Sequence, residues 1–416
     1  MHVAYIHQHF NTTRDHGGTR SYEMSKRLLY AGHKVTMISG ISDAARHRID
    51  IRSDKSEAVV DGINVIYINI PYQSSLHFWQ RVAVFRRFAR QAETVAIDSD
   101  ADLVLASSTP LTVGLPGMRA ARRLGVPFVF EIRDPWPELP IEMGIIRNPL
   151  LKWYLRRLER KLYHAADHCI ALSPGMRDGI IGTGYPEHQV SMIPNSSDVD
   201  LFRPTRNDET PHPSVDERDC TFIYSGAHGY CNNLDALIDA ALELKRRREQ
   251  HIRFYCIGDG VLKDQHIQRT QREGLGDYLE WLDPIPKVEL AQRLSTFDVG
   301  MMLLGNHRIF RYGTSPNKFF DYIAAGLPVL NNYSGWLADM ICEHEIGKAI
   351  LPDTPVAFAD ACVWFRDHRV QREEMGERSR TLAVNQFSRD RLGTEFVHLL
   401  ENVAATTTPE LAAADV

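Results

Sequence analysis

Short apolar runs alternate with amphipathic helical segments along most of this chain. The runs have the length of buried strands, and apolar residues at helical spacing lie between most of them. In the first half these runs are Val3–His7, Lys34–Ser39, Asn64–Ile68, Leu103–Ala106, Phe128–Ile132 and Cys169–Leu172. In the second half they are Thr221–Tyr224, Ile252–Ile257, Tyr278–Leu282 and Asp298–Leu304. Alternating strands and helices predict an α/β protein whose parallel sheets carry helices on both faces.

One stretch predicts a division into two domains. Residues 204–219 are rich in proline and charge and contain almost no apolar side chain, which is typical of a linker. We therefore expect a first domain over residues 1–203 and a second over residues 220–388. Helical periodicity is present near 356–368 and again near 389–403. The small, polar residues 404–416 are expected to form a disordered tail.

The segment Arg311–Leu330 reads as a loop, a short helix and a buried strand. Ser315 is a good N-cap and Pro316 fits the first helical position, while the glycine and proline after the helix mark its end. The free N–H groups of a helix start favour an anion, and Lys318 in the first turn fits a bound phosphate. A capped surface helix with one solvated lysine explains the same residues. The segment is therefore a candidate phosphate site with a structural alternative.

Two loops of the first half follow apolar strands and carry further candidate residues. Gly17 and Gly18 lie between the first strand and a helix predicted over Arg20–Tyr30, where glycine lets a ligand approach the backbone closely; a plain turn is the alternative. The loop after the strand Phe128–Ile132 contains a cation, two acids and an aromatic ring, which suit polyhydroxyl and phosphate recognition. Ligands of parallel sheets bind beyond the carboxyl ends of the strands. A proline-rich turn with a structural salt bridge also fits this second loop.

Composition narrows the function. The chain has 416 residues, 44% of them hydrophobic and 24% charged, which is ordinary for a soluble globular protein, and its formal net charge of −5 argues against general nucleic-acid binding. The six cysteines show no zinc-binding spacing, so we expect reduced thiols in a cytoplasmic protein. His164 and His168 have the spacing of a metal pair but no evident third ligand, and Asp98–Asp102 reads as a solvated turn, so no metal site is expected. No apolar run reaches the roughly 18 residues of a membrane span.

The predicted helix over Phe78–Arg90 interleaves aromatic and basic side chains. Such a helix can lie on an anionic membrane surface. An apolar stripe of this kind is also typical of a helix that packs on a core and exposes a solvated basic face. Both interpretations stay open.

Three motifs together resemble those of family 4 glycosyltransferases, which are retaining enzymes of the GT-B fold. Ser315–Tyr322 is similar to the donor motif of the branch that reads Ser-Pro-Asn-Lys-x-x-Asp/Glu-Tyr. Glu131–Glu138 matches the sequence Glu-x-Arg-Asp-x-Trp-Pro-Glu of that branch, and Gly17, Gly18 and Glu23 match a Gly-Gly stretch with a following acid. The resemblance implies two Rossmann-like, doubly wound domains that face a cleft, with a hinge near Ser191–Phe202 and a last helix that crosses back to the first domain.

The resemblance also implies roles for individual residues. In that family an acid at the place of Asp321 holds the ribose of a nucleotide sugar, and the amides before it hold the diphosphate. The first acid of the usual Glu-x7-Glu pattern is replaced here by Gly313, so Thr314, Asn317 or another loop is expected to contact the sugar. The other implied donor residues are Gly17, Gly18, Ser225, Gly226, His228, Lys263, Ser315, Lys318 and, through its backbone at the base, Ile285, with Asn232 and Asn233 as alternative donors to phosphate. The implied acceptor residues are Arg133, Asp134, Trp136 and Glu138.

The function implied is retaining transfer of a sugar from a nucleotide diphosphate donor, without a metal or another cofactor. Lys318 is expected to stabilise the leaving diphosphate, and Asp134 to orient the acceptor. The resemblance implies a uridine diphosphate sugar, with an N-acetylated sugar as one option, and a glycan or lipid-linked acceptor in bacterial surface polysaccharide synthesis. A lipid-linked acceptor would bring the Phe78–Arg90 helix to the inner face of the membrane.

Two other functions are compatible with the same sequence. A nucleotide-sugar epimerase of the same fold would convert the donor without any acceptor. A non-catalytic protein would bind the nucleotide sugar without turnover. The glycine at position 313, and the absence from the loop Ser225–Asn233 of the arginine and lysine that many family members place there, make this second alternative worth testing.

Overall fold

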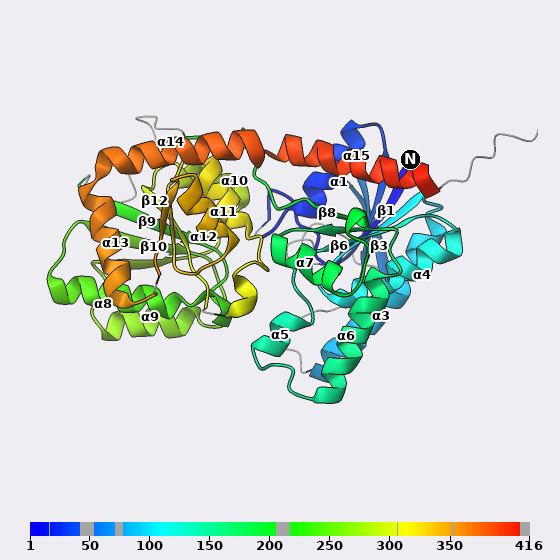
Figure 1. Ribbon diagram of the computed structural model, residues 1–416, viewed down its shortest axis with the longest axis horizontal. Helices are drawn as coiled ribbons and strands as arrows, with labels where there is room; N and C mark the ends of the chain where they lie inside the picture. Colours follow the sequence, from blue (N-terminus) through cyan, green and yellow to red (C-terminus); the bar gives the residue numbers. More distant parts are fainter. Residues whose placement is uncertain are drawn as a thin grey trace, which may run out of the picture.

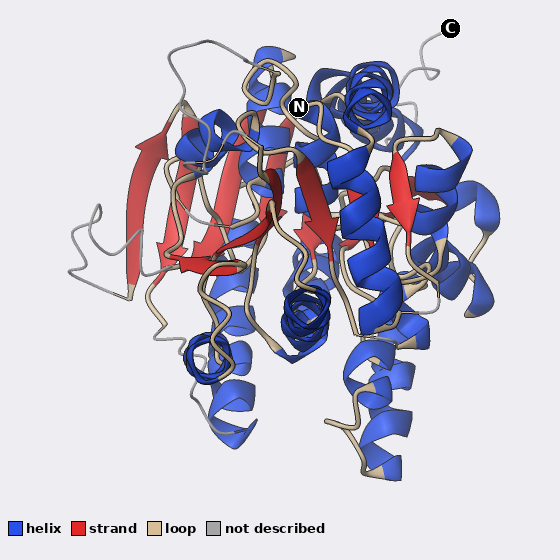
Figure 2. Cartoon of the chain, turned by 90° about the vertical axis from the view of Figure 1, so that its left-hand side faces the viewer, coloured by secondary structure: helices blue, strands red, loops and turns tan. Residues whose placement is uncertain are grey.

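The computed structural model describes residues 1–15, 17–41, 54–70, 78–204, 216, 218–305, 307–351 and 353–407. Two α/β domains lie side by side, and two long helices from the end of the chain run along one edge of both (Figure 1). Strands lie between layers of helices in each domain (Figures 1 and 2). The two-domain α/β architecture expected from the sequence is confirmed.

The sheet of the first domain has eight strands. They are β1 (His2–Ile6), β2 (Lys34–Gly40), β3 (Lys55–Val60), β4 (Ile63–Ile68), β5 (Leu103–Ser107), β6 (Phe128–Ile132), β7 (His168–Ala171) and β8 (Val190–Met192). Their order is β3-β4-β2-β1-β5-β6-β7-β8, and every pair is parallel except β3 and β4. That antiparallel pair is a hairpin closed by Asp61 and Gly62, which both have positive φ as a two-residue turn of this type requires.

The sheet of the second domain has six strands, all parallel. They are β9 (Cys220–Ser225), β10 (Ile252–Ile257), β11 (Leu279–Leu282), β12 (Val299–Met302), β13 (Val329–Asn331) and β14 (Gly347–Ala349), in the order β11-β10-β9-β12-β13-β14. The strand order reverses between β1 and β5 in the first sheet and between β9 and β12 in the second. Crevices for ligands form at such reversals, beyond the carboxyl ends of the strands.

Helices connect the strands. Those of the first domain are α1 (Arg20–Tyr30), α3 (Phe78–Asp98), α4 (Gly114–Leu124), α5 (Glu138–Glu142), α6 (Pro149–Tyr163) and α7 (Pro174–Gly182). Those that follow are α8 (Leu234–Arg247), α9 (Lys263–Arg272), α10 (Lys287–Leu294), α11 (Asn317–Ala324), α12 (Trp336–Glu343), α13 (Pro355–Asp367), α14 (Arg369–Gln386) and α15 (Arg389–Thr407). Short 3₁₀ turns occur at Leu111–Val113, Glu187–Gln189, Tyr230–Asn232 and Arg308–Phe310. α6, α7 and α13 begin with proline after Asn148, Ser173 or Thr354, whose side chains accept hydrogen bonds from first-turn amides.

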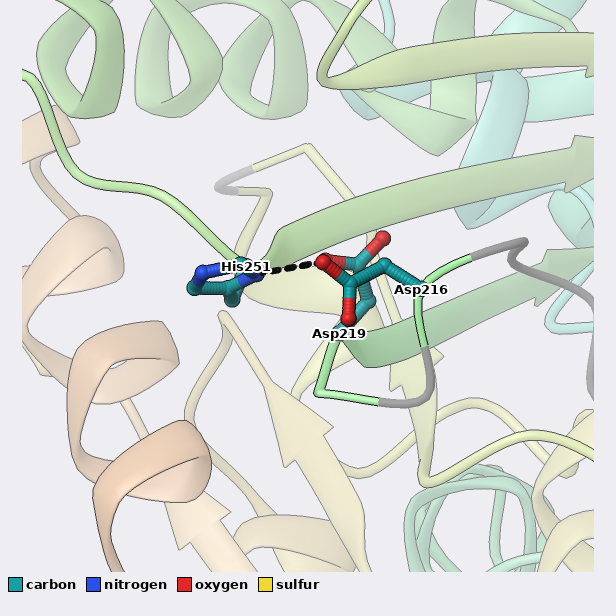
Figure 3. A group of neighbouring side chains, drawn as sticks. All are labelled: Asp216, Asp219 and His251. Carbon is teal, nitrogen blue, oxygen red and sulfur yellow. Dashed lines mark hydrogen bonds and ion pairs between the residues drawn. The ribbon is translucent and has the colours of Figure 1, made fainter.

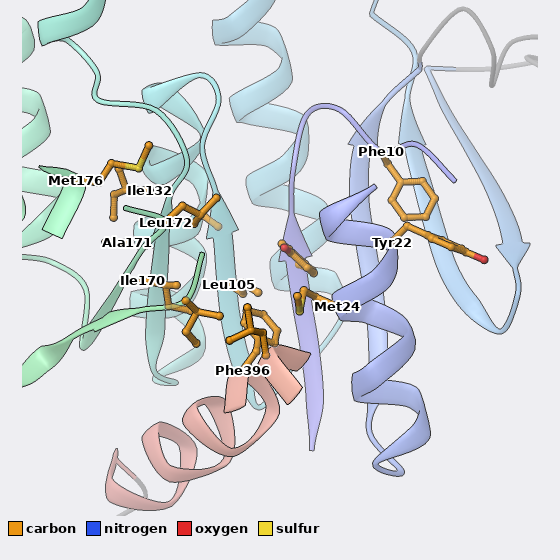
Figure 4. Close-up of a cluster of buried hydrophobic side chains, with 14 of the residues drawn as sticks. Phe10, Tyr22, Met24, Leu105, Ile132, Ile170, Ala171, Leu172, Met176 and Phe396 are labelled. Carbon is orange, nitrogen blue, oxygen red and sulfur yellow. The ribbon is translucent and has the colours of Figure 1, made fainter. Parts of the chain in front are cut away.

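The last helix belongs structurally to the first domain. Phe396 of α15 is fully buried among side chains of the first domain such as Met24, Leu105 and Ile170 (Figure 4). Polar contacts hold the same helix against α1, since Arg27 pairs with the carboxylate of Asp390 at 2.6 Å. The chain therefore crosses back to its starting domain, as expected.

The two crossings between the domains lie next to each other. The segment that leaves the first domain and the segment that returns to it form a parallel bridge between Ser197 and Ser388. The amide of Ser197 donates to the carbonyl of Phe387 at 3.2 Å, and the amide of Arg389 donates to the carbonyl of Ser197 at 2.9 Å. Two chain segments therefore connect the domains, and backbone hydrogen bonds join these segments to each other.

The expected strands are present within one or two residues of their predicted ends. The sequence interpretation did not include β3, β14, α12 or α14, and the start of its domain-closing strand and hinge at Ser191–Phe202 coincides with β8. Most of the predicted linker, residues 205–215 and 217, lies outside the described residues, so the domain boundaries stay a prediction. α15 continues to Thr407, past the predicted start of the tail at residue 404, and residues 408–416 lie outside the described part.

Candidate active site in the interdomain cleft

A cleft with a cavity volume of about 350 Å³ lies between the two domains. From the first domain it is lined by His7, His9, Asn11, Gly18, Thr109, Arg133, Asp134 and Asn195, and from the second by Leu304, Thr314, Ser315, Pro316 and Asn317. These residues follow the carboxyl ends of β1, β5, β6, β8 and β12 or lie at the start of α11. A crevice of this position and size, rich in polar groups, is the default ligand site of an α/β protein.

Gly18 is the point where three parts of the cleft wall meet. A Cβ atom at this position would lie 3.1 Å from Nδ2 of Asn317 and 3.5 Å from a guanidinium nitrogen of Arg133. Asn317 starts α11 in the second domain, and Arg133 follows β6 in the first. The glycine therefore allows the two domains to approach each other at the cleft.

His7 and Arg133 form a polar pair in the cleft wall. A guanidinium only donates, so Nε2 of His7 accepts the 2.8 Å hydrogen bond from Arg133, and Nδ1 carries the proton that it donates to Ser21 Oγ at 2.9 Å. Burial and the positive charge of Arg133 keep the pKa of His7 well below its ordinary value. His7 is therefore a neutral group that orients the guanidinium toward the cleft.

Asp134 faces the same cleft from the next position. Its carboxylate accepts a hydrogen bond from the hydroxyl of Thr109, and the amide of Arg133 donates to Ser108 Oγ at 2.9 Å. The loops after β5 and β6 are thus bonded to each other. An acid held this way can accept hydrogen bonds from the hydroxyl groups of a sugar.

Arg20 and Glu131 form a buried ion pair behind this wall of the cleft. Nε of Arg20 lies 2.8 Å from Oε1 of Glu131, and both side chains are almost fully buried. Burial raises the pKa of Glu131, but the charges of Arg20 and Arg133 and a hydrogen bond from Ser107 outweigh it, so the net pKa is lowered. The same guanidinium donates to the carbonyls of Ile193 and Pro194 at 2.9 and 2.7 Å. Arg20 therefore ties the end of β6 to the segment that leads into the second domain.

That segment holds the start of the predicted phosphate motif. The amide of Asn195 donates to Ser315 Oγ at 3.0 Å, and its side chain donates to the carbonyl of Ser315 at 2.5 Å. The expectation that Ser315 caps α11 is wrong, because Pro316 occupies the N-cap position and the serine hydroxyl is engaged by Asn195. The predicted anion site therefore still lies at the start of α11. Asn195 of the first domain holds the serine that precedes this helix.

Lys318 lies away from the cleft lining. Its ammonium group is 3.7 Å from the centre of the Tyr224 ring, and a Cβ atom on Gly226 would lie 2.7 Å from it. Burial lowers the pKa of Lys318 to about 7. Lys318, the predicted phosphate cation, is thus buried against the loop after β9. With this pKa it is only partly charged near neutral pH.

The other predicted phosphate residues of the second domain lie in this loop or next to it. The His228 side chain is fully buried, and no described residue hydrogen bonds either of its ring nitrogens. Burial and the nearby charge of Lys263 lower the pKa of His228 to about 4. Lys263 itself pairs with Asp283 at 2.7 Å. Ser225 is held by α11, since its amide donates to the hydroxyl oxygen of Tyr322 at 2.8 Å.

Asp321, the expected ribose ligand, is buried in this structure. Its carboxylate lies 3.1 Å from the ammonium of Lys287 and accepts a hydrogen bond from Ser197 Oγ at 3.0 Å. Both charged side chains are about 5% exposed, so the acid is occupied by a lysine of α10 and a serine of the domain junction. Ribose binding by Asp321 would require this pair to rearrange.

The position of the missing acid has no room for a side chain. A Cβ atom on Gly313 would lie 2.4 Å from the carbonyl oxygen of Ile309 and 3.3 Å from a ring carbon of Pro135. The loop before α11 is folded tightly against the first domain at this point. The glycine is therefore a requirement of this loop rather than an isolated loss of a carboxylate.

The remaining predicted residues do not line the cleft. Gly17 has a φ of 98° and lies beside Asn11. Trp136 and Ile285 are partly buried against the hydrophobic core. Glu138 is exposed and forms a two-pronged ion pair with Arg156 at 2.7 and 3.0 Å. The structural salt bridge considered as an alternative for this loop is therefore present.

Several cleft residues were not predicted from the sequence. They are His7, His9, Asn11, Thr109, Asn195, Leu304 and Pro316. The first three directly follow β1, so the rule that ligands lie beyond the carboxyl ends of strands would have selected them. Asn195 follows β8 and lies within the predicted hinge, but its role depends on a contact across the domain boundary that the sequence does not show.

One group of side chains has the spacing of a metal site. Asp216, Asp219 and His251 offer ligand atoms within 4.8 Å of one another (Figure 3). Arg218 lies 2.6 Å from the carboxylate of Asp216, and His251 Nδ1 lies 3.1 Å from Asp219. The group lies before β9 and β10, at the sheet edge opposite the cleft. It takes no part in the cleft.

Two models of glycosyltransferase domains match the chain. The model described as "Glycosyl transferase 4-like domain" matches residues 17–196, and "Glycosyl transferases group 1" matches residues 219–367. Together they span most of the chain, one in each domain, with residues 197–218 between them. The chain therefore belongs to the glycosyltransferases of the GT-B fold.

Individual proteins agree with this class. The probable glycosyltransferase WbjE of Pseudomonas aeruginosa is 24% identical over 66% of this chain and 69% of its own length. A GDP-mannose-dependent alpha-mannosyltransferase of Mycobacterium tuberculosis is 25% identical over 60% of each chain. Among solved structures, sucrose-phosphate synthase of Thermosynechococcus elongatus has a TM-score of 0.76 at 15% identity, covering 97% of this chain and 99% of that one. Anabaena HepE, solved with UDP and glucose, has a TM-score of 0.70 at 15% identity, covering 97% and 100%.

Proposed function

We propose that this glycosyltransferase transfers a sugar from a uridine diphosphate donor, with retention of configuration and without a metal, to a glycan or lipid-linked acceptor of a bacterial surface polysaccharide. The observation that carries the proposal is the cleft in which the start of α11 faces Arg133 and Asp134 of the first domain. A helix start attracts a diphosphate, and the opposite wall offers a cation and a carboxylate for sugar hydroxyls.

The donor side of the proposal rests on the second domain. As the nucleoside diphosphate leaves, negative charge grows on its phosphates, and preorganised amides and cations stabilise that charge. Asn317 lines the cleft at the start of α11, while Lys318 lies against Gly226 of the loop after β9. The negative charge of a diphosphate between them would favour the charged form of Lys318, so the lysine would take up the proton that it loses on burial. Asp134, on the opposite wall, would orient the acceptor.

The similar proteins differ in the base of the nucleotide with which they are named. HepE was solved with UDP and glucose, whereas the mannosyltransferase relative is named as dependent on GDP-mannose. We propose the uridine nucleotide, because the Ser315–Tyr322 motif resembles the branch of family 4 that builds surface polysaccharides. The place of action in this proposal is the cytoplasmic face of the membrane. Among the described residues, no helix is long and apolar enough to cross a bilayer.

The test is a panel of uridine and guanosine diphosphate sugars, with chelator present. Thermal shift reports binding, and release of the nucleoside diphosphate with and without a lipid-linked acceptor fraction reports transfer. Acceptor-dependent release of UDP supports the proposal, and the anomeric configuration of the product, read by NMR, tests retention. Conversion of the donor without acceptor would mean an epimerase, and binding without release under all acceptors would favour the binding-only function.

A matched pair of variants tests whether the α11 start holds the diphosphate. Asn317→Asp places a negative charge at that helix start without changing its size, and we expect the donor Kd to rise by at least about tenfold. Asn148→Asp makes the same change at the start of α6, where aspartate caps a helix as well as asparagine. That control should bind the donor normally. Equal donor affinity in both variants would exclude the α11 start as the diphosphate site.

A further inference from the structure

α6 projects away from the sheet of the first domain, with the connection from α5 at its outer end (Figure 1). Four large apolar side chains at this end face solvent. Ile145 is 70% exposed, Leu150 77%, Trp153 63% and Tyr154 55%. Single exposed apolar residues are ordinary, but a group of this size within ten residues marks an interaction surface. We call residues 145–161 the α6 tip.

The α6 tip is also strongly basic. Its cations are Arg147, Lys152, Arg156, Arg157, Arg160 and Lys161, and all but the half-buried Lys152 are exposed. Its single acid is Glu159, and burial raises the pKa of that carboxyl to about 7. Glu138 of α5 pairs with Arg156, so the net positive charge of the tip rests on the other five cations. The chain as a whole carries a formal charge of −5. Positive charge is therefore concentrated on the surface where the apolar side chains are exposed.

The local structure holds these groups in place. The side chain of Asn148 accepts hydrogen bonds from the amides of Leu150 and Leu151 at 2.9 and 3.2 Å, which fixes the helix start. The guanidinium of Arg157 lies 5.8 Å from the centre of the Trp153 ring, within cation–π range. The tip thus presents an aromatic ring and a cation together on a rigid helix.

The helix that the sequence suggested for membrane contact differs from α6. In α3, the side chains of Phe78–Val82 lie outside the described part, but Phe88 is buried in the core and Val84 packs against it. The described section of α3 therefore directs these apolar side chains inward. At the α6 tip the apolar side chains face outward.

We propose that the α6 tip docks on the surface of an anionic lipid bilayer. Aromatic and aliphatic side chains flanked by arginine and lysine are suited to the boundary between headgroups and acyl chains. A second copy of the chain is disfavoured as the occupant, because a two-fold interface would place these cations against each other. The inference rests on this surface alone and does not depend on the proposed donor, acceptor or mechanism.

The experiment measures binding of the full chain to vesicles by sedimentation. Vesicles of phosphatidylcholine are compared with vesicles containing about a third phosphatidylglycerol. We expect binding to the anionic vesicles that weakens as salt is added. Trp153→Ala with Tyr154→Ala should weaken partitioning on the order of tenfold. Arg157→Gln with Arg160→Gln should weaken it about fivefold for each charge removed.

The chain offers a matched control on another helix. Tyr30 of α1 is 74% exposed, and the ammonium of Lys26 lies 5.8 Å from its ring, the same arrangement as at Trp153. Tyr30→Ala should bind vesicles like the unaltered protein. Circular dichroism and thermal melting check that each variant is folded, which the exposure of the changed residues favours.

Four results would overturn the proposal. They are no binding to anionic vesicles, equal binding to both vesicle types, an unchanged affinity of both tip variants, and an equal loss in the Tyr30→Ala control. Light scattering adds a fifth: a dimer that dissociates in the Trp153 and Tyr154 variant would show that a second copy covers the tip. None of these measurements depends on sugar transfer. A failure of the proposed transferase activity would therefore leave the result for the α6 tip unaffected.

Discussion

Lys318 gives the sharpest test of the donor site, because its protonation is expected to change when a diphosphate binds. Burial lowers the pKa of this lysine to about 7 in the free protein. At pH 8 only about a tenth of the molecules then carry a charged Lys318. A diphosphate beside Gly226 and the start of α11 would return the pKa toward the ordinary lysine value of about 10.4.

The expected proton uptake follows from these two pKa values. Binding of a nucleoside diphosphate should take up about 0.9 proton per site at pH 8, about 0.5 at pH 7 and about 0.1 at pH 6. At pH 8 the terminal phosphate of the ligand, with a pKa of about 6, is already ionised and contributes nothing. The uptake at pH 8 therefore reports on the protein.

Titration calorimetry in two buffers of different ionisation enthalpy measures this number directly. The slope of the observed enthalpy against the buffer enthalpy gives the protons taken up. Lys318→Met keeps a long apolar side chain against Tyr224 and should remove the uptake while weakening binding. A buffer-independent enthalpy at pH 8 would refute the reasoning. An uptake that persists in Lys318→Met would move the proton to another group.

The stability of the free protein provides an independent check that the pKa of Lys318 is lowered. Between pH 7 and about 10 the unfolded chain binds more protons at position 318 than the folded chain does, so this residue makes folding more favourable as the pH rises. The Lys318→Met variant lacks that contribution. We expect the thermal midpoint of the unaltered protein to rise relative to the variant between pH 7 and pH 9, and a constant difference would contradict the lowered pKa.

Three further substitutions test the cleft and its support. Gly18→Ala brings a methyl group within 3.1 Å of Asn317 and should lower kcat/KM about tenfold while the melting temperature stays nearly constant; an unchanged rate would remove Gly18 from the site. Gly313→Glu restores the family's acid where its Cβ would lie 2.4 Å from the carbonyl of Ile309, so denaturant unfolding should show a loss of about 1–3 kcal/mol, and a gain in activity would contradict this view of the loop. Arg20→Met leaves a buried carboxylate unpaired and should cost about 3–5 kcal/mol in the same assay, whereas near-wild-type stability would mean that the pair is not essential.

The fold was predictable because its pattern is local. Apolar runs at strand length, separated by helical periodicity, fix two parallel sheets, and parallel sheets place their binding residues at one edge. This is why Gly18, Arg133, Asp134 and the residues around Ser315 lie together although they are far apart in the sequence. The hairpin of β3 and β4 also had a local signal in Asp61-Gly62, which the interpretation of the sequence did not use.

The details of the site were less predictable because they depend on contacts between distant segments. Ser315 is a sound N-cap by its sequence, but Asn195 of the other domain binds its hydroxyl. Lys318 reads as a phosphate-binding cation or a solvated lysine, but the ring of Tyr224 and the loop at Gly226 bury it. Asp321 reads as a ligand, yet Lys287 pairs with it. In each case one long-range partner changes the role that local sequence suggests.

The paired crossings at Ser197 and Ser388 restrict how the enzyme can open. A single connecting segment would let the domains swing and twist in any direction, whereas two segments bonded side by side define an axis. Points close to that axis move least, and points far from it move most. Substrate entry is then governed by one angular coordinate, so a single distance between fluorophores placed on the two domains would follow the whole opening motion.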